Sequence, residues 1–156
     1  MATRIIDSSE FNVHQLRDHI LRIVSGEEGS NPFKVEVQSF GFRYGIPMES
    51  SIVMDVRFLP NPFFVPELKP YSGLDDTVRD YIMNMPETEG FLGRFLTLLD
   101  MLVPSYQREG KAYLTISIGC TGGRHRSVAL AEAIARHLQT FLPTVRATHR
   151  DIEKGQ

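Results

Sequence analysis

The chain has 156 residues, of which 42% are hydrophobic and 23% charged, and its formal net charge is −2. A chain of this length fits one compact domain that buries about 70% of its unfolded surface. The small negative charge excludes nucleic-acid binding driven by the overall field, so any such binding needs a local basic patch. The single cysteine excludes an internal disulfide and a multi-cysteine metal site.

The sequence has no apolar run of about 18 residues, the length that crosses a bilayer. Its first residues, MATRIIDSSEF, lack the apolar core of a signal peptide. We therefore expect a cytoplasmic protein without a membrane partner.

The chain begins with a predicted strand and helix over residues 1–26. Asn12 is a suitable helix N-cap, and apolar residues follow at helical spacing: Val13, Leu16, Ile20, Ile23 and Val24. A polar, glycine-containing stretch then predicts a linker, placed at residues 27–34. The main domain is expected over residues 35–156.

Two runs with strand character open the main domain, at residues 35–40 and 52–58. Four prolines within residues 59–70 predict an irregular, rigid segment. A short helix is expected over residues 75–83, and Pro86 starts a longer one. The spacing predicts one apolar face on this longer helix, formed by Phe91, Phe95, Leu98, Leu99 and Leu102.

Residues 113–118, YLTISI, form the clearest predicted strand, which runs into a glycine-rich loop and then a helix. This helix has apolar side chains on one side: Val128, Ala131, Ile134, Ala135 and Leu138. A last strand is expected at residues 144–148. Strands that alternate with helices predict an α/β fold, here a single domain with a mostly parallel sheet and flanking helices.

The sequence IGCTGGRHRS, residues 118–127, concentrates groups that bind anions. A strand, a glycine turn and a helix aim backbone N–H groups and the positive end of the helix dipole at one point. Gly122 and Gly123 let an anion approach the backbone closely, and Arg124 and Arg126 add guanidinium forks suited to phosphate. The other polar residues of this predicted oxyanion cradle are Cys120, Thr121, His125 and Ser127.

The same loop fits C-x-x-G-x-x-R-S, the phosphate-binding loop of cysteine-dependent phosphatases. A thiolate nucleophile at Cys120 is chemically feasible, because a helix N-terminus and nearby arginines lower a thiol pKa. Against it, Gly119 occupies the position where the phosphatase signature usually has histidine. No flexible-loop motif identifies a general acid among the candidates Asp55, Asp75, Asp76 and Asp80. Anion binding is the favoured interpretation, and the phosphatase is the alternative.

Asp55 and Arg57 follow the second predicted strand, near its carboxyl end. In parallel sheets ligands bind beyond the carboxyl ends of the strands, so these residues are expected at the same edge as the Cys120 loop. The functional interpretation places Asp55 on a ligand hydroxyl or amine and Arg57 beside the phosphate. A purely structural contact of Asp55 with Arg57 or with backbone is the alternative.

Basic residues near the C-terminus indicate a second kind of partner. Arg146, His149 and Arg150 alternate along the last predicted strand and its exit, where they could contact phosphate or RNA backbone. Together with Arg124 and Arg126 they form the predicted RNA-binding surface. The alternative is an edge strand whose charges block aggregation.

Several longer segments resemble one family: SFGFRYGIP (39–47), DVRFLPNP (55–62), GLD (73–75) and YLTISIGCTGGRHRSVALAE (113–132). They are similar to the C-terminal domain of the RapZ (YvcJ-like) family of RNase adapter and nucleotide-binding proteins. Residues 5–24 resemble the last strand and helix of that family's N-terminal ATPase domain. The sequence has no G-x-x-x-x-G-K-[ST] motif, so we expect no ATP hydrolysis.

The resemblance implies a non-enzymatic sensor and adapter domain with a phosphofructokinase-like fold, which self-associates and uses no cofactor or metal. It implies binding of a phosphorylated sugar, either glucosamine-6-phosphate or a nucleotide sugar. It also implies binding of small RNAs that the adapter presents to an endonuclease. Carried over residue by residue, the sugar-phosphate pocket comprises Asp55, Arg57, Asn61 and residues 120–127.

Two features depart from the adapter members of this family. Phe63 follows the Asn61-Pro62 pair, where those members often have histidine, and the tail DIEKGQ lacks their run of lysine and arginine. Since each lost phosphate contact removes salt-dependent affinity, we expect RNA binding to be weaker or absent.

Overall fold

A computed structural model describes residues 33–154 of the chain. The strand and helix predicted within residues 1–26, and most of the predicted linker, lie outside the described residues. Phe33, inside the predicted linker, is buried in the core, and Lys34 opens the first strand.

The described residues form one four-stranded sheet in which every neighbouring pair is parallel. The strands are β1 (Lys34–Gly41), β2 (Ile52–Asp55), β3 (Tyr113–Cys120) and β4 (Arg146–His149), in the spatial order β2-β3-β1-β4. The predicted single-domain α/β fold with a mostly parallel sheet is therefore confirmed. In the register, Gly41 at the end of β1 lies opposite Cys120 at the end of β3.

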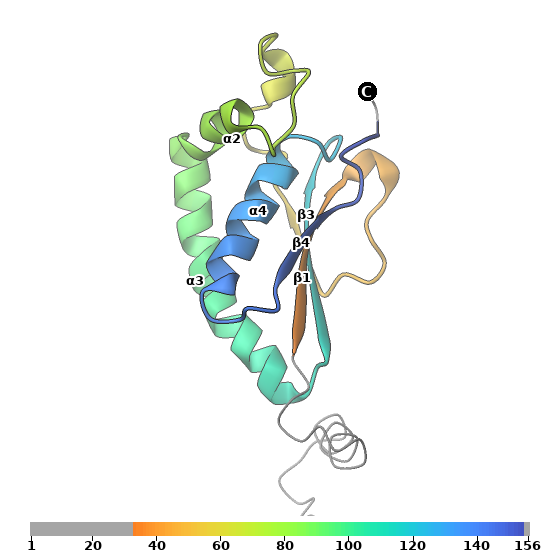
Figure 1. Ribbon diagram of the computed structural model, residues 1–156, viewed down its shortest axis with the longest axis vertical. Coiled ribbons are helices and arrows are strands. Elements are labelled where there is room, and N and C mark those ends of the chain that lie inside the picture. The colour runs from red at the N-terminus through yellow and green to blue at the C-terminus, as the bar shows by residue number, and fades with distance from the viewer. Residues whose placement is uncertain (1–32, 155–156) are drawn as a thin grey trace, which may run out of the picture.

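Three helices cover one face of the sheet, as Figure 1 shows to the left of the strands. They are α2 (Asp76–Met83), α3 (Pro86–Glu109) and α4 (Arg126–Gln139). The loop between β1 and β2 lies on the other side, where Ser50 Oγ is 2.6 Å from Ser117 Oγ and Ser51 donates its N–H to the Thr115 carbonyl. The sheet is thus enclosed by helices on one face and by a loop on the other.

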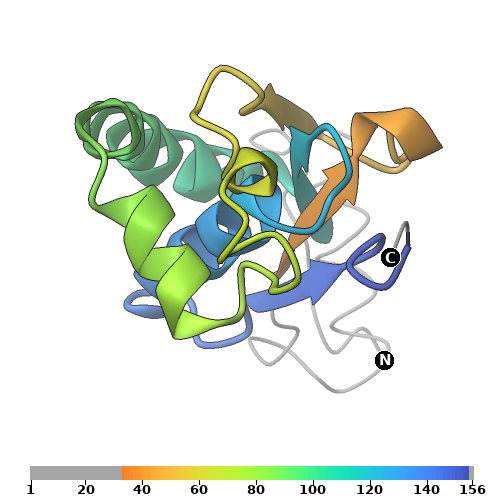
Figure 2. The same ribbon diagram turned by 90° about the horizontal axis from the view of Figure 1, so that it is seen from above.

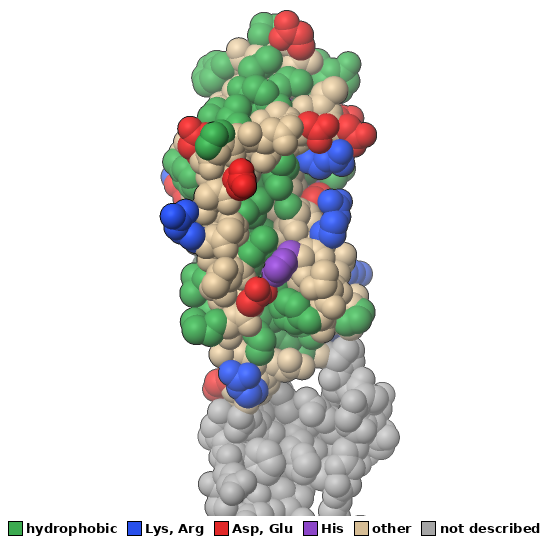
Figure 3. All heavy atoms as spheres, turned by 90° about the vertical axis from the view of Figure 1, so that its left-hand side faces the viewer, with side chains coloured by type: hydrophobic (Ala, Val, Ile, Leu, Met, Phe, Trp, Pro, Cys, Tyr) green, Lys and Arg blue, Asp and Glu red, His purple; other side chains and the backbone are tan. Residues whose placement is uncertain are grey.

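The core lies between the sheet and α3 and α4. Its β-strand members alternate along β1 and β3, as expected for strands that present every second side chain to the helices. They are Val35, Val37, Leu114, Ile116, Ile118 and Cys120. The outer side of the helical layer carries hydrophobic side chains interspersed with charged ones (Figure 3).

Helix α4 buries the predicted apolar side, with Val128, Ala131, Ile134, Ala135 and Leu138. The prediction for α3 is partly wrong, because the buried face is rotated by part of a turn from the predicted one. Leu98 is 43% exposed, and the helix instead buries the row Thr88, Leu92, Phe95, Leu99 and Val103. These five residues follow one another at intervals of three or four, which is the stripe that a straight helix presents to a sheet.

Strand β2 is shorter than the predicted run of residues 52–58. Its last hydrogen bond to β3 runs from the Val56 N–H to the Gly119 carbonyl, at 2.8 Å, and beyond it the N–H groups of Arg57 and Leu59 have local acceptors. Arg57 N–H bonds the Asp55 side chain at 2.9 Å, and Leu59 N–H bonds the Val56 carbonyl at 3.2 Å. The last strand likewise begins later than predicted, at Arg146.

The carboxyl ends of the strands gather the irregular segments of the domain. Seen from above in Figure 2, the one-turn 3-10 helices η1 (Phe42–Tyr44) and η2 (Pro62–Phe64) lie around the loop that follows β3. The turn after β4 joins them there. The predicted irregular character of residues 59–70 is confirmed, since η2 and turns make up this segment.

Candidate anion-binding site

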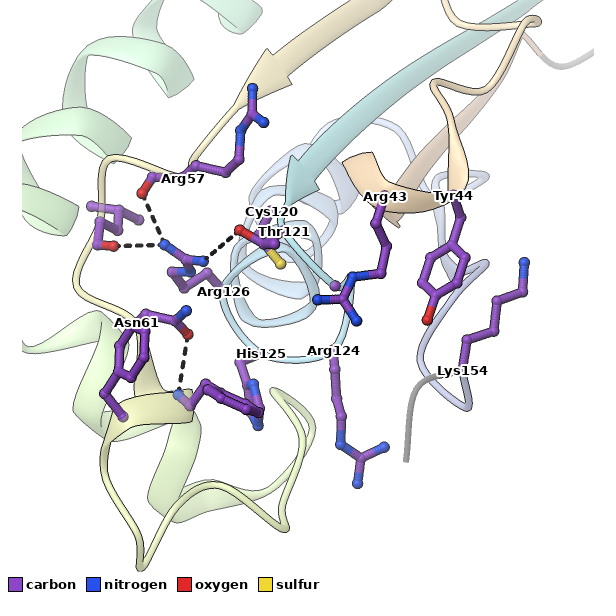
Figure 4. A pocket seen from close by; sticks show the side chains of 14 residues that line it. Arg43, Tyr44, Arg57, Asn61, Cys120, Thr121, Arg124, His125, Arg126 and Lys154 are labelled. Carbon is purple, nitrogen blue, oxygen red and sulfur yellow. Dashed lines mark hydrogen bonds between the residues drawn. The ribbon is translucent and has the colours of Figure 1, made fainter.

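A cavity of about 520 Å³ opens at the carboxyl ends of the strands. This volume lies within the range of about 300–1,000 Å³ that is usual for small-molecule sites. Figure 4 shows the cavity from close by, with side chains from η1, from η2, from the loop after β3 and from the C-terminal turn. The lining residues are Arg43, Tyr44, Arg57, Leu59, Asn61, Phe63, Phe64, Cys120, Thr121, Gly122, Arg124, His125, Arg126 and Lys154.

The shape of the loop after β3 depends on close backbone packing. Gly123 has a φ of +75°, and a Cβ atom there would lie 2.5 Å from the Gly41 nitrogen. A side chain at this position is therefore strained twice, by conformation and by contact. The loop carbonyls of Thr121 and Arg124 accept N–H bonds from the backbone of Arg43 and Gly73, at 3.3 and 2.9 Å. These contacts fix the loop against both neighbouring segments.

Gly119, which departs from the phosphatase signature, has a packing reason. A Cβ at this position would lie 2.5 Å from ring atoms of both Phe40 and Phe42. Those two rings pack edge to face, with centroids 4.8 Å apart. Any side chain here requires the two packed rings to move, which accounts for the glycine whatever chemistry Cys120 performs.

Cys120 lies at the inner end of the cavity and is only 3% exposed. Its Sγ atom is 3.1 Å from Ser127 Oγ. Ser127 is fully buried and does not line the cavity. The serine thus contacts the sulfur from the protein side, and Cys120 forms part of the wall rather than an open, projecting group.

Arg126 is the most buried cation of the site, at 4% exposure. Its Nη1 atom donates to the carbonyls of Arg57 and Leu59 at 2.9 and 2.8 Å, and Nη2 lies 3.4 Å from Thr121 Oγ1 (Figure 4). Its buried Nε has no hydrogen-bond partner among the described residues. Burial lowers the pKa of Arg126, and the negative charge of Asp55 opposes that shift. Carbonyl partners fix the guanidinium without cancelling its charge.

Arg124 and His125 complete the loop. Arg124 donates to the carbonyls of Ile152 and Pro70, at 2.8 and 2.9 Å, and so ties the loop to the C-terminal turn and to the proline-rich segment. His125 is 6% exposed, and its buried Nε2 has no hydrogen-bond partner among the described residues. Burial lowers the pKa of His125, which favours the neutral ring.

Asp55 and Arg57 form an ion pair, with Nη2 and Oδ2 2.6 Å apart. The hydrogen bond from Arg57 lowers the pKa of Asp55. The Arg57 guanidinium also lies over the Phe42 ring, 4.0 Å from its centroid. Arg57 lines the cavity and Asp55 does not. The structural contact between Asp55 and Arg57, which was the alternative to a ligand contact, is therefore formed, and Asp55 orients Arg57.

Of the predicted anion-binding residues, the structure brings eight to the cavity wall: Arg57, Asn61, Cys120, Thr121, Gly122, Arg124, His125 and Arg126. Asp55, Gly123 and Ser127 support the wall from behind. Sequence reasoning missed Arg43, Tyr44 and Lys154, which come from η1 and the C-terminal turn. For Arg43 and Tyr44 the sequence did offer an indication. Both follow the end of β1, the strand that pairs with β3, so they lie at the same edge of the sheet as the Cys120 loop.

Asp151 explains how Lys154 reaches the cavity. Its fully buried carboxylate accepts the Gly41 N–H at 2.8 Å and pairs with Arg150 and Lys154, each at 2.8 Å. Burial alone raises the pKa of Asp151, but these hydrogen bonds outweigh it and hold the pKa below its ordinary value. The C-terminal turn is thereby fastened to the end of β1.

The predicted RNA-binding residues do not form one surface. Arg124 is at the cavity and Arg126 is buried, whereas Arg146 begins β4 at the opposite end of the sheet. The His149 ring is held between Ser39 Oγ at 2.8 Å and Glu132 Oε1 at 2.7 Å. Arg150 binds Asp151 and the Gly45 carbonyl.

Within residues 33–154, no group of three or more His, Cys, Asp or Glu side chains is placed to hold a metal ion. None of the helices in that part of the chain is long and apolar enough to cross a membrane.

Comparison with known proteins identifies the family. Residues 33–153 match the family model described as the RapZ C-terminal domain. Proteins named "Nucleotide-binding protein" are similar over the whole chain or nearly so: 72% identical in Pelobacter propionicus, 62% in Trichlorobacter lovleyi and 58% in Geobacter sulfurreducens. The chain covers 54% of each relative, so it spans about half of their length.

The match confirms the resemblance seen in the motifs around Arg43, Asp55 and Cys120. It covers all described residues except Lys154, and so every residue that lines the cavity apart from that lysine. Family and names fit a regulatory adapter domain. The chain belongs to the RapZ C-terminal domain family.

Proposed function

We propose that this domain is a ligand-sensing adapter domain that binds a phosphorylated amino sugar, glucosamine-6-phosphate or a related nucleotide sugar, in the cavity at the Cys120–Arg126 loop. The observation that carries the proposal is the state of Arg126. A buried guanidinium that contacts carbonyl oxygens keeps its full charge, and its buried Nε lacks a partner among the described residues. Burying an uncompensated charge is costly, and a phosphate at the loop would offset that cost.

The rest of the wall supports a sugar phosphate as the occupant. Thr121 and Asn61 offer polar groups, while Leu59, Phe63 and Phe64 offer apolar surface for the faces of a sugar ring. Asp55 stands behind Arg57 and is 46% exposed, within the reach of a ligand that displaces part of the ion pair. Such a mixture of a fixed anion cradle and a partly apolar wall is typical of small-molecule sites.

Binding without turnover is favoured over the phosphatase alternative. No carboxyl group lines the cavity in the described part of the chain, and Asp55, the nearest candidate, pairs with Arg57, whose hydrogen bond lowers the pKa of Asp55 and so makes it a poor general acid for the leaving oxygen. Asp75 accepts the Ser72 N–H at 2.7 Å, and Asp76 and Asp80 pair with Arg79. These engagements support a sensor that holds its ligand.

RNA binding is the second candidate, as part of an adapter that presents small RNA to an endonuclease. It is supported by Arg43, Arg124 and Lys154, which place positive charge around the mouth of the cavity. The separation of Arg146 from this cluster weakens it. A fall in RNA affinity with salt, steep in proportion to the number of phosphate contacts, is the expected signature.

Isothermal calorimetry with three probes tests the first proposal. Glucosamine-6-phosphate is expected to bind saturably, glucose-6-phosphate more weakly, and unphosphorylated glucosamine not at all, because the loop recognises the phosphate. Equal binding of glucosamine and its phosphate would contradict the proposal. Absence of heat with either phosphate at millimolar concentration would do the same.

A further inference from the structure

The cavity carries two sets of cations that are held in different ways. The inner set, Arg124 and Arg126, belongs to the loop after β3 and is fixed by carbonyl oxygens. The outer set, Arg43 and Lys154, comes from η1 and the C-terminal turn. Figure 4 shows the outer pair on one side of the loop, away from Arg57 and Asn61 on the other.

The outer cations keep positive charge that residues 33–154 do not cancel. Arg43 is exposed, and its side chain forms no hydrogen bond or ion pair with residues 33–154. Lys154 pairs with Asp151, but that carboxylate also pairs with Arg150 at the same distance, 2.8 Å. One carboxylate shared by two cations leaves the group net positive.

The position of Lys154 is nevertheless defined. Its Nζ atom lies over the Tyr44 ring, 5.0 Å from the centroid, and 2.8 Å from Asp151 Oδ1. Asp151 is anchored in turn by the Gly41 N–H. Arg43 neighbours Tyr44 in η1, and its own backbone N–H bonds the Thr121 carbonyl. The outer cations are therefore tied to the same loop that forms the inner cradle.

We propose that the cavity holds its ligand by two anionic groups, one at the Cys120–Arg126 loop and a second between Arg43 and Lys154. The ligand class is then a sugar that carries two phosphoryl groups, either as a nucleoside diphosphate sugar or as a sugar bisphosphate. This inference rests on the proposed function and narrows its ligand. A monophosphate fills the inner cradle and leaves the outer cations without a contact to the ligand, whereas two phosphoryl groups engage both sets.

Calorimetry with three phosphorylated probes tests the second subsite. Glucosamine-6-phosphate has one phosphoryl group, and UDP-N-acetylglucosamine and glucose-1,6-bisphosphate each have two. Both two-phosphoryl probes are titrated, and the tighter one identifies the source of the second group. We expect at least one of them to bind the unmodified chain more tightly than the monophosphate does.

The variant Arg43→Ala locates the effect. It is expected to weaken the tighter two-phosphoryl probe about tenfold, the effect of one lost charge-assisted contact, and the monophosphate by about twofold or less. Arg94→Ala, which removes an exposed arginine of α3 outside the cavity, is the matched control and should change neither.

Three outcomes overturn the inference. Equal weakening of all probes by Arg43→Ala would mean a general field effect. Tighter binding of the monophosphate than of both other probes would mean a single anion subsite, with the proposed function intact. Failure of every probe to bind the unmodified chain would remove the proposed function and the second subsite together.

Discussion

The two ends of the parallel sheet both carry basic side chains, but they hold them differently. At the amino ends, Lys34 and Arg146 line a hollow of about 380 Å³ together with Glu36. Lys34 lies over the ring of Tyr113, which is itself 65% exposed. At the carboxyl ends, Arg126 is 4% exposed and is fixed by two carbonyl oxygens.

The difference shows what makes a basic cluster a binding site. Exposed cations beside a carboxylate are solvated and screened, so an anion gains little from them. A buried guanidinium whose hydrogen-bond partners are uncharged carbonyl and hydroxyl oxygens gains much from an anion. The two ends of the sheet therefore differ in how firmly their basic side chains are fixed and how deeply they are buried. They do not differ in this respect through the number of charges.

The largest expected effect comes from removing the fixed cation. Arg126→Ala should lower the affinity for glucosamine-6-phosphate by about a hundredfold or more, because two charge-assisted contacts are lost. Arg146→Ala, at the other end of the sheet, is the matched control and should leave affinity unchanged. Calorimetry measures both.

Arg126→Lys separates binding from folding in that comparison. It keeps a positive charge but not the planar fork, so it should restore only part of the affinity. Thermal unfolding of each variant shows whether the fold is intact. If a folded Arg126→Ala variant kept full affinity for glucosamine-6-phosphate, the proposed difference between the two ends of the sheet would be contradicted.

A second prediction concerns the backbone that shapes the loop. Gly123→Ala should lower the free energy of unfolding by about 2 kcal/mol or more, since the residue needs a positive φ and its Cβ would meet the backbone of Gly41. Gly93→Ala, in the exposed part of α3 with open space at its Cβ, should raise it by up to about 1 kcal/mol. Urea unfolding of both variants checks the opposite signs.

The third and smallest effect concerns the buried carboxylate beneath the outer cations. Asp151→Asn should cost about 1–2 kcal/mol at neutral pH, as Arg150 and Lys154 lose a charged partner. Because the folded pKa of Asp151 lies below its ordinary value of 3.8, its stabilising effect is complete above that value and is lost as pH falls through the folded pKa.

The pH profile of unfolding gives a sharper readout than the single value. Between pH 7 and pH 3, the unmodified chain should lose more stability than Asp151→Asn does. Asp76→Asn, which alters an exposed carboxylate of α2, should follow the unmodified chain. Parallel profiles for all three proteins would show that Asp151 has no special role.

Local patterns in the sequence were sufficient for most of the fold. The spacing of Val128, Ile134 and Leu138 identified the buried side of α4, because small alanines fill the positions between them. In α3 the same reasoning failed, since Leu98 and Leu99 are adjacent and offer two apolar rows. Only packing against the sheet decides which row is buried, and that information is not local.

The candidate site also has residues that local sequence predicts and residues that only the three-dimensional arrangement reveals. The loop residues Thr121, Arg124 and Arg126 were predicted because they adjoin one another in sequence. Arg43 and Lys154 were missed, since their approach depends on the strand order that places β1 beside β3 and β4. Arg126 was predicted to be accessible to RNA, and the structure buries it, because the carbonyls after β2 bind its guanidinium.

The most direct test of the central claim is phosphorus NMR of glucosamine-6-phosphate mixed with the unmodified chain and with Cys120→Ser. We predict a shifted or broadened phosphate resonance in both samples, with the sugar phosphate still intact after prolonged incubation. That result means that the loop holds an anion and does not consume it. Growth of an inorganic phosphate signal with the unmodified chain, absent from Cys120→Ser, would contradict the account and make Cys120 a nucleophile.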